Sequence, residues 1–194
     1  MSRIAASDAF ADVDLGDLGQ GDRINVGVAA IMSRRPEVAQ ALGGLTSALR
    51  ASGTLSPRLR ELVRLRIAFH NQCRSCMAVR YQSALDDGLT EGAVCSLEQP
   101  AEADDLSDAE RSALRFADLF ATNHLAIDNS VYDELRTHFT EDELVELGLN
   151  CAVAVGLGRL TATWDVIDDV PDAFRAGAET SAAPWVSGAV VASG

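Results

Sequence analysis

Three helix-start signals constrain the fold of this chain more than any other feature. Ser56-Pro57 supplies an N-cap hydroxyl followed by proline at the first helical position. Ser107-Asp-Ala-Glu110 and Thr140-Glu-Asp-Glu143 are capping boxes, in which the hydroxyl and the later carboxylate bond each other's backbone N–H groups. These signals predict helices that begin near residue 57, span about 106–122 and span about 140–156.

Helical spacing of apolar residues extends this pattern over most of the chain. It predicts further helices over 24–32, 36–50 and 130–139, and one that ends at Asp87-Gly88, where glycine suits a helix C-cap. No long alternation of β-branched residues and no hairpin turn between apolar runs argues for strands. We therefore expect an all-α fold, a compact helical domain of roughly eight helices.

The ends of the chain differ in composition from its middle. Residues 1–22 are acidic and contain glycine, and residues 175–194 are small and poorly periodic. We expect an N-terminal arm over 1–22, one helical domain over 23–174 with an acidic linker at 99–106, and a C-terminal tail over 175–194.

The charge balance excludes several classes of partner. The chain has 16 basic and 29 acidic residues, a formal net charge of -13, which repels nucleic acid and anionic membrane surfaces. Early aspartates argue against a secretory signal, and no uninterrupted apolar run reaches the roughly 18 residues that span a bilayer. We expect a cytoplasmic protein with no nucleic acid and no membrane partner.

Cys73 and Cys76 form a CxxC motif, and two thiols at this spacing can close a reversible disulfide. The motif fits the first turn of a helix, where free backbone N–H groups favour a thiolate. Cys95 and Cys151 stand alone among small or apolar residues and are expected to pack in the core. A zinc site needs about four ligands, and the three histidines lack the paired spacing for one, so no metal is expected.

Glu61 lies twelve residues before Cys73, about 18 Å away along one straight helix. A turn at His70-Asn71-Gln72, with Asn71 ending one helix and capping the next, would bring the carboxylate beside the thiols. Glu61 is then a candidate proton acceptor. The alternative is an exposed partner of Arg64 or Arg58. Tyr81 is expected to be a packing residue.

A set of motifs resembles the alkylhydroperoxidase D and carboxymuconolactone decarboxylase superfamily. It consists of Leu55-Ser-Pro-Arg-x-x-Glu61-Leu, Asn71-x-Cys73-x-x-Cys76 and Asp87-Gly-Leu-Thr90. Later segments between Tyr132 and Arg159 are similar to the longer members, so the resemblance covers roughly residues 25–170. It implies an all-helical, oligomeric fold and, in the CxxC branch, thiol peroxidase or disulfide reductase chemistry without a bound cofactor.

The resemblance also implies roles for single residues. Cys76 matches the peroxide-reactive cysteine, Cys73 its resolving partner and Glu61 the carboxylate of the proton relay. Arg80 stands where that branch has a relay histidine, and Ser75 stands where some members have another. We expect Arg80, one helical turn beyond Cys76, to stabilise the thiolate or to pair with Glu61, although guanidinium cannot shuttle protons.

His70 is the nearest substitute base, and its alternative role is a helix cap or surface group. The expected function is a peroxidase or oxidoreductase that acts on a small peroxide or disulfide. An external dithiol or thioredoxin-like reductant would reset it. The alternatives are a non-catalytic or regulatory member that has lost the relay, and a decarboxylase-type lyase that acts on a lactone. Apolar residues around much of the region 140–168 predict a homo-oligomer.

Overall fold

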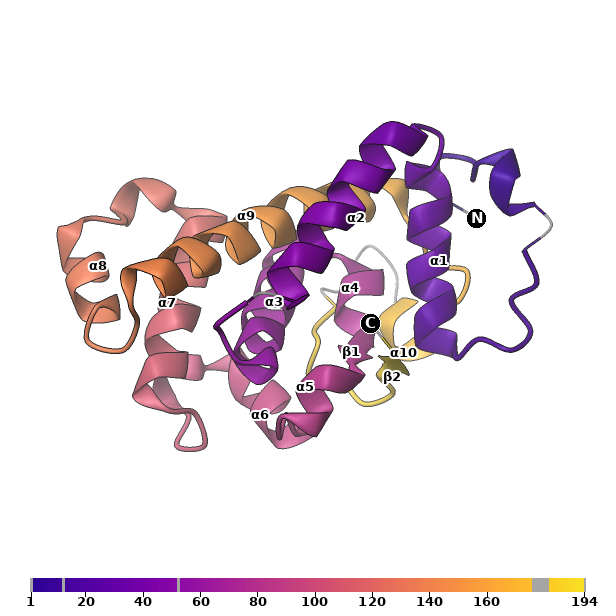
Figure 1. Cartoon of the computed structure of the whole chain (residues 1–194). Coiled ribbons are helices and arrows are strands. Elements are labelled where there is room, and N and C mark those ends of the chain that lie inside the picture. Colours follow the sequence, from indigo (N-terminus) through magenta and orange to yellow (C-terminus); the bar gives the residue numbers. More distant parts are fainter. Residues whose placement is uncertain (1, 12, 52, 176–181, 194) are drawn as a thin grey trace.

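The computed structural model describes residues 2–11, 13–51, 53–175 and 182–193. Within these ranges it has ten α-helices, four short 3₁₀ helices and two short strands (Figure 1). The helices are α1 (Gln20–Met32), α2 (Pro36–Ala51), α3 (Pro57–Asn71), α4 (Arg74–Ala78), α5 (Gln82–Asp86), α6 (Glu91–Cys95), α7 (Asp108–Thr122), α8 (Asn129–Leu135), α9 (Glu141–Trp164) and α10 (Asp172–Arg175). The 3₁₀ helices are η1 (Asp8–Phe10), η2 (Ser96–Glu98), η3 (Pro100–Glu102) and η4 (His124–Ala126), and the strands are β1 (Val79–Tyr81) and β2 (Val190–Ala192).

The three predicted helix starts are confirmed in detail. The Ser56 hydroxyl accepts a hydrogen bond from the N–H of Leu59 at the start of α3. Both capping boxes are formed, at Ser107 of α7 and at Thr140 of α9. The all-α fold class is therefore confirmed, and local capping chemistry determines where α3, α7 and α9 begin.

Helix α3 is the central element of the fold. It packs against α7 on one side and α9 on another, and its residues Leu62, Leu65 and Ile67 are fully buried. In Figure 1, α1 lies toward one end of the molecule and α7 and α8 toward the other, and α2 runs across the middle of the view. The main apolar core lies where α3, α7 and α9 meet.

A two-stranded parallel sheet is the feature that the sequence did not predict. Val79 of β1 pairs with Val190 of β2, and Tyr81 pairs with Ala192. Segments of three residues are too short to show an alternating pattern, so no signal for them exists in the sequence. Gly21 of α1 allows the close approach of β2, because a Cβ there would lie 2.3 Å from the Val191 carbonyl oxygen. Residues 176–181 of the expected tail lie outside the described residues.

Helix α9 is the one helix in the described ranges that is long and apolar enough to cross a membrane by length and composition, with a mean hydropathy of 1.4. It contains no uninterrupted apolar run of that length, because Asn150 and Arg159 divide its apolar residues. In the fold, α9 packs against α3, α7 and α2 as a bundle helix. Its residues Val145 and Leu149 stay 64% and 44% exposed, so one apolar stripe is uncovered.

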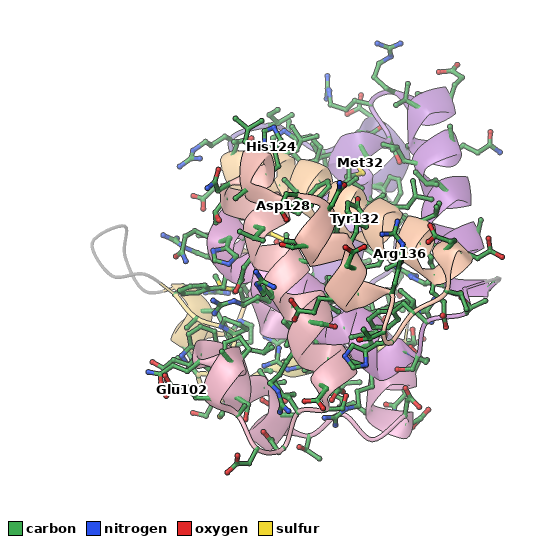
Figure 2. The ribbon with its side chains drawn as sticks, turned by 90° about the vertical axis from the view of Figure 1, so that its left-hand side faces the viewer. Met32, Glu102, His124, Asp128, Tyr132 and Arg136 are labelled. Atoms are coloured by element: carbon green, nitrogen blue, oxygen red, sulfur yellow. A yellow bond between two sulfur atoms is a disulfide. The ribbon has the colours of Figure 1, made fainter. Side chains whose placement is uncertain are left out.

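The surface over α7 and α8 has the opposite character. Figure 2 shows Asp128, Tyr132 and Arg136 on this face among many polar side chains. Asp128 caps α8 through the N–H groups of Ser130 and Val131, and Arg136 lies over the Tyr132 ring at 5.7 Å. Several exposed apolar side chains lie along α9 and α2, and α2 has no buried residue. Leu125 of η4, between α7 and α8, is also exposed, at 86%.

Candidate functional site

The CxxC motif forms a disulfide between Cys73 and Cys76, with their Cα atoms 5.2 Å apart. Cys73 is the N-cap residue of α4, and Cys76 lies within that helix, as the spacing predicts. The two sulfurs differ in access. Cys73 is 0% exposed and contacts the Ser75 hydroxyl at 3.6 Å, whereas Cys76 is partly exposed and lines a cavity.

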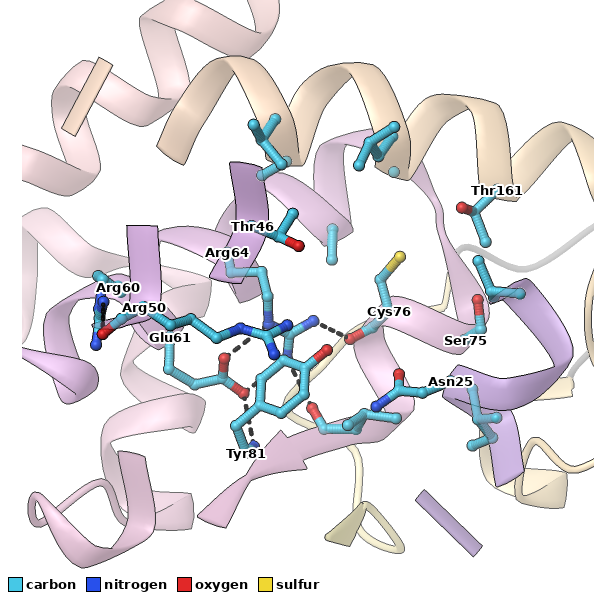
Figure 3. A pocket seen from close by; sticks show the side chains of 18 of the residues that line it. Asn25, Thr46, Arg50, Arg60, Glu61, Arg64, Ser75, Cys76, Tyr81 and Thr161 are labelled. Carbon is cyan, nitrogen blue, oxygen red and sulfur yellow. Dashed lines mark hydrogen bonds and ion pairs between the residues drawn. The ribbon is translucent and has the colours of Figure 1, made fainter. Parts of the chain in front are cut away.

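The cavity beside Cys76 has a volume of about 670 Å³ (Figure 3). Residues of α1, α2, α3, α4 and α9 line it, most of them apolar. Its polar side chains include Asn25, Arg50, Glu61, Arg64 and Tyr81. A hollow of this size with a few converging polar groups is typical of small-molecule sites.

Glu61 is buried, 3% exposed, and is held by Arg64. Arg64 donates to both carboxylate oxygens, from Nε at 2.7 Å and from Nη2 at 2.6 Å. The same guanidinium donates to the Cys76 carbonyl at 2.7 Å and to the Val79 carbonyl at 2.8 Å. Glu61 is thus the partner of Arg64, as one alternative expected, but the pair is buried beside the CxxC helix.

Arg64 keeps its charge in this setting. Burial alone lowers the pKa of Arg64, but the charge of Glu61 and the hydrogen bonds to it raise that pKa above its ordinary value. The fixed cation beside the Cys76 backbone is therefore Arg64, a residue that the motif comparison with the superfamily left without a role. Its spacing of three residues from Glu61 on α3 is the only signal in the sequence that could have found it.

Tyr81 is a second residue of the site, and from the sequence it is expected only to pack. Its backbone N–H donates to Glu61 Oε1 at 3.2 Å. Its ring lies under two guanidinium groups, that of Arg50 at 5.1 Å and that of Arg64 at 5.0 Å. Figure 3 shows the phenol group inside the cavity on the side of Cys76. No motif could indicate this, because β1 orients Tyr81 and its pairing depends on distant β2.

Arg80 does not follow Cys76 on one helical face, and that expectation is wrong. Helix α4 ends at Ala78 and Arg80 lies in strand β1, which turns its side chain away from the cavity lining. Its guanidinium is buried and donates to Glu91 at 3.0 Å and to the carbonyls of Met77 and Pro184. Burial lowers the pKa of Arg80 despite the Glu91 partner. Glu91, rather than Glu61, is its ion-pair partner.

His70 and Asn71 also lie apart from the thiols. His70 Nε2 is 2.6 Å from Asp118 of α7, and His70 does not line the cavity. Asn71 does not cap α4. Its amide donates to the Ala154 carbonyl at 3.0 Å and accepts from Arg159, which ties the end of α3 to α9. Gly158 permits this contact, because a Cβ there would lie 2.5 Å from Asn71 Nδ2.

The other two cysteines, Cys95 and Cys151, are free thiols. Cys151 is fully buried in the main core, and burial raises the pKa of its thiol to about 12. Cys95 is exposed, so the expectation that it packs in the core is wrong, and its sulfur lies 3.8 Å from the Trp185 carbonyl oxygen. In the described ranges, no group of three or more His, Cys, Asp and Glu side chains is arranged to hold a metal ion.

Comparison with known proteins agrees with this geometry. Residues 36–119 match the carboxymuconolactone decarboxylase family, and these residues include Glu61, Cys73 and Cys76. The matched segment makes up less than half of the 194-residue chain and is similar to this family over that part. The family generally contains enzymes.

Two curated relatives come from Mycobacterium tuberculosis. They are the uncharacterized proteins MT2376 of strain CDC 1551 and Rv2313c of strain H37Rv, each 37% identical to this chain over 128 residues. The match covers 62% of this chain and 44% of each relative. The chain therefore matches less than half of the length of these relatives.

Solved structures share the fold at lower identity. A variant of the debrominase Bmp8, in complex with 2,3,4-tribromopyrrole, aligns with a TM-score of 0.68 at 21% identity over 91% of this chain and 95% of that chain. An alkylhydroperoxidase AhpD core, an uncharacterized peroxidase-related protein from Ralstonia eutropha JMP134, aligns with a TM-score of 0.68 at 20% identity over 89% and 94%. These likenesses show a shared all-helical fold, which agrees with the fold that the sequence motifs imply.

Proposed function

We propose that this protein is a thiol-dependent peroxidase or disulfide oxidoreductase in which Cys76 is the nucleophile and Cys73 the resolving cysteine. The observation that carries the proposal is the asymmetry of the pair. Both sulfurs are close enough to bond, yet only Cys76 lines the 670 Å³ cavity while Cys73 is completely buried. A substrate in the cavity meets Cys76 first.

The peroxidase cycle balances as follows. The Cys76 thiolate attacks one oxygen of a peroxide ROOH, the O–O bond breaks, and the leaving alkoxide takes a proton to give ROH and Cys76 sulfenic acid. The Cys73 thiol then attacks that sulfur and releases water, which forms the disulfide. An external dithiol, or a thioredoxin-like reductant, restores both thiols by exchange and is itself oxidised to a disulfide.

Three groups around Cys76 support this chemistry. Arg64 supplies a permanent positive charge beside the Cys76 backbone, which favours the thiolate. Glu61 accepts two hydrogen bonds on Oε1 and one on Oε2, so Oε2 keeps a lone pair that can take a proton. The Tyr81 phenol is the remaining candidate donor to the leaving oxygen. Arg80 is assigned a structural role, because its hydrogen bonds hold Glu91 and the Pro184 carbonyl.

We also propose a cytoplasmic homo-oligomer, since such a cycle requires a reducing compartment. Apolar side chains exposed along α2 and α9 support assembly through these helices, namely Val38 (47%), Leu45 (40%), Val145 (64%), Leu149 (44%) and Leu160 (41%). Sedimentation of the wild type should give a multiple of the 20.5 kDa chain mass. A monomer at micromolar concentrations would refute the oligomer.

The function is tested by peroxide consumption with a dithiol reductant. Cys76→Ser should lower the rate at least about 100-fold because the nucleophile is gone. Cys95→Ser is the matched control and should retain wild-type turnover, since Cys95 is exposed and outside the cavity. If the wild type consumes no more peroxide than Cys76→Ser, and reduces no disulfide faster, the regulatory alternative becomes the better account.

A further inference from the structure

The charges that line the cavity contrast with those of the whole chain. Acidic residues outnumber basic ones by 29 to 16 overall. The cavity is lined by three arginines, Arg50, Arg60 and Arg64, and by two carboxylates, Asp22 and Glu61. A local excess of positive charge in an acidic protein favours a negatively charged ligand at that place.

Most of these charges already have partners in the protein. Arg64 holds Glu61, and Asp22 accepts from the backbone N–H of Ser193 at 2.9 Å and from its hydroxyl at 2.8 Å. Arg60 donates to the carbonyls of Leu49 at 2.6 Å and Arg50 at 3.3 Å, at the C-terminal end of α2. Arg60 therefore caps that helix.

Arg50 is the exception. Within the described part of the chain, no carboxylate oxygen forms an ion pair with the Arg50 guanidinium, that is, none lies within 4.0 Å of its nitrogens. Its guanidinium instead lies over the Tyr81 ring at 5.1 Å, and Arg64 lies over the same ring at 5.0 Å. Figure 3 shows Arg50 reaching across the cavity toward Tyr81 and Arg64. Two cations thus lie over the same Tyr81 ring. Among the described residues, Glu61 is the one carboxylate that bonds either cation, and it bonds Arg64.

We propose that Arg50 and Tyr81 form an anion subsite and that the substrate is an amphipathic molecule with one carboxylate. The carboxylate would accept hydrogen bonds from the Arg50 guanidinium, which suits planar anions, and from the Tyr81 hydroxyl. The apolar body would lie against Val28, Val153 and Leu157, which line the rest of the cavity. The reacting end would then meet Cys76. This inference rests on the proposed function only for the reaction at Cys76.

Binding is measured by calorimetry on Cys76→Ser, with octanoate and octanamide as probes that differ in charge but not in chain length. Octanoate should bind about tenfold more tightly than octanamide, because only octanoate pairs with Arg50. Arg50→Gln should abolish this difference. Arg35→Gln removes an equal charge from an exposed position outside the cavity and should preserve it. Equal affinities for the two probes, or a preference that survives Arg50→Gln, would overturn the subsite.

A kinetic comparison separates this inference from the proposed function. Wild type and Arg50→Gln are assayed with a fatty-acid hydroperoxide and with its methyl ester. The subsite predicts a KM about tenfold higher for the acid in Arg50→Gln, with kcat and the ester kinetics little changed. Turnover without preference for the acid contradicts the subsite alone. Selective octanoate binding without any turnover contradicts the peroxidase proposal alone.

Discussion

The two sides of helix α3 carry the same kind of charge cluster in opposite surroundings. Toward α7, Arg66 holds Asp118 at 2.6 Å, and His70 contacts the same carboxylate at 2.6 Å. Toward the cavity, Arg64 holds Glu61 at 2.6 Å, and Tyr81 donates its backbone N–H to that carboxylate. Each cluster consists of one arginine, one carboxylate and one ring residue.

The difference lies in what surrounds each cluster. On the α7 side, Arg66 also donates to the Leu97 carbonyl at 2.6 Å, and α3 and α7 pack against each other in the main apolar core. On the other side the cluster borders a hollow of about 670 Å³ that also contains the outer face of the disulfide. Buried ion pairs alone therefore do not mark a site in this fold. The site is marked by the cavity and by the accessible Cys76 sulfur.

The largest expected contrast concerns the arginines. Arg64→Ala leaves the Glu61 carboxylate, which is 3% exposed, without its counterion and should destabilise the protein by about 3–5 kcal/mol. Arg66→Ala should cost less, about 1–3 kcal/mol, because the Asp118 side chain is 29% exposed and keeps His70. Urea unfolding measures both. A larger loss for Arg66→Ala would contradict the comparison.

The next largest contrast is expected in the free energy of unfolding that is lost when an apolar side chain is shortened on either side of α3. Leu65 is 0% exposed in the main core, so Leu65→Ala should cost about 2–5 kcal/mol. Leu157 of α9 lines the cavity and is only partly buried, so Leu157→Ala should cost about 1 kcal/mol or less. Equal losses in thermal or urea unfolding would show that the cavity is filled in solution, for example by a partner subunit.

The smallest effect is a pH dependence on the closed side. Burial alone raises the pKa of Asp118, but the hydrogen bonds from His70 and Arg66 lower it below its ordinary value of 3.8. A depressed pKa stabilises the fold above pH 3.8 and loses that contribution as the pH falls through the lower folded value. The stability difference between wild type and Asp118→Asn should therefore shrink from pH 5 to pH 2. If the stability difference instead grows on acidification, the lowered pKa assigned to Asp118 is wrong.

How far the sequence predicts this molecule depends on the range of the interactions involved. Capping at Ser56, Ser107 and Thr140 is local, and the helices begin where these residues predict. The helical position of Cys73 and Cys76 is equally local. The position of Arg80 does not depend on local sequence alone, because β1 exists only through its pairing with β2, more than one hundred residues away. The expectation of a helix through Arg80 failed for that reason.

The same reason explains the residues that the sequence analysis left without a role. Tyr81 faces the cavity because β1 turns the chain, and Arg50 reaches it from the end of a different helix. Neither relation leaves a spacing pattern. From the sequence, Arg64 is expected only as an exposed partner of Glu61, since a spacing of three residues does not reveal burial.

The most direct test of the central claim is to trap the intermediate on the cavity side of the pair. Reduced Cys73→Ser protein is treated with one equivalent of peroxide and with dimedone, which labels sulfenic acids, and the label is mapped by mass spectrometry. The account predicts a label on Cys76 and none on Cys151, whose thiol pKa is raised to about 12 by burial. Parallel treatment of Cys76→Ser should leave Cys73 unlabelled, since Cys73 is fully buried. A label on Cys73 in Cys76→Ser, or no label on Cys76 in Cys73→Ser, would contradict the assignment of the nucleophile.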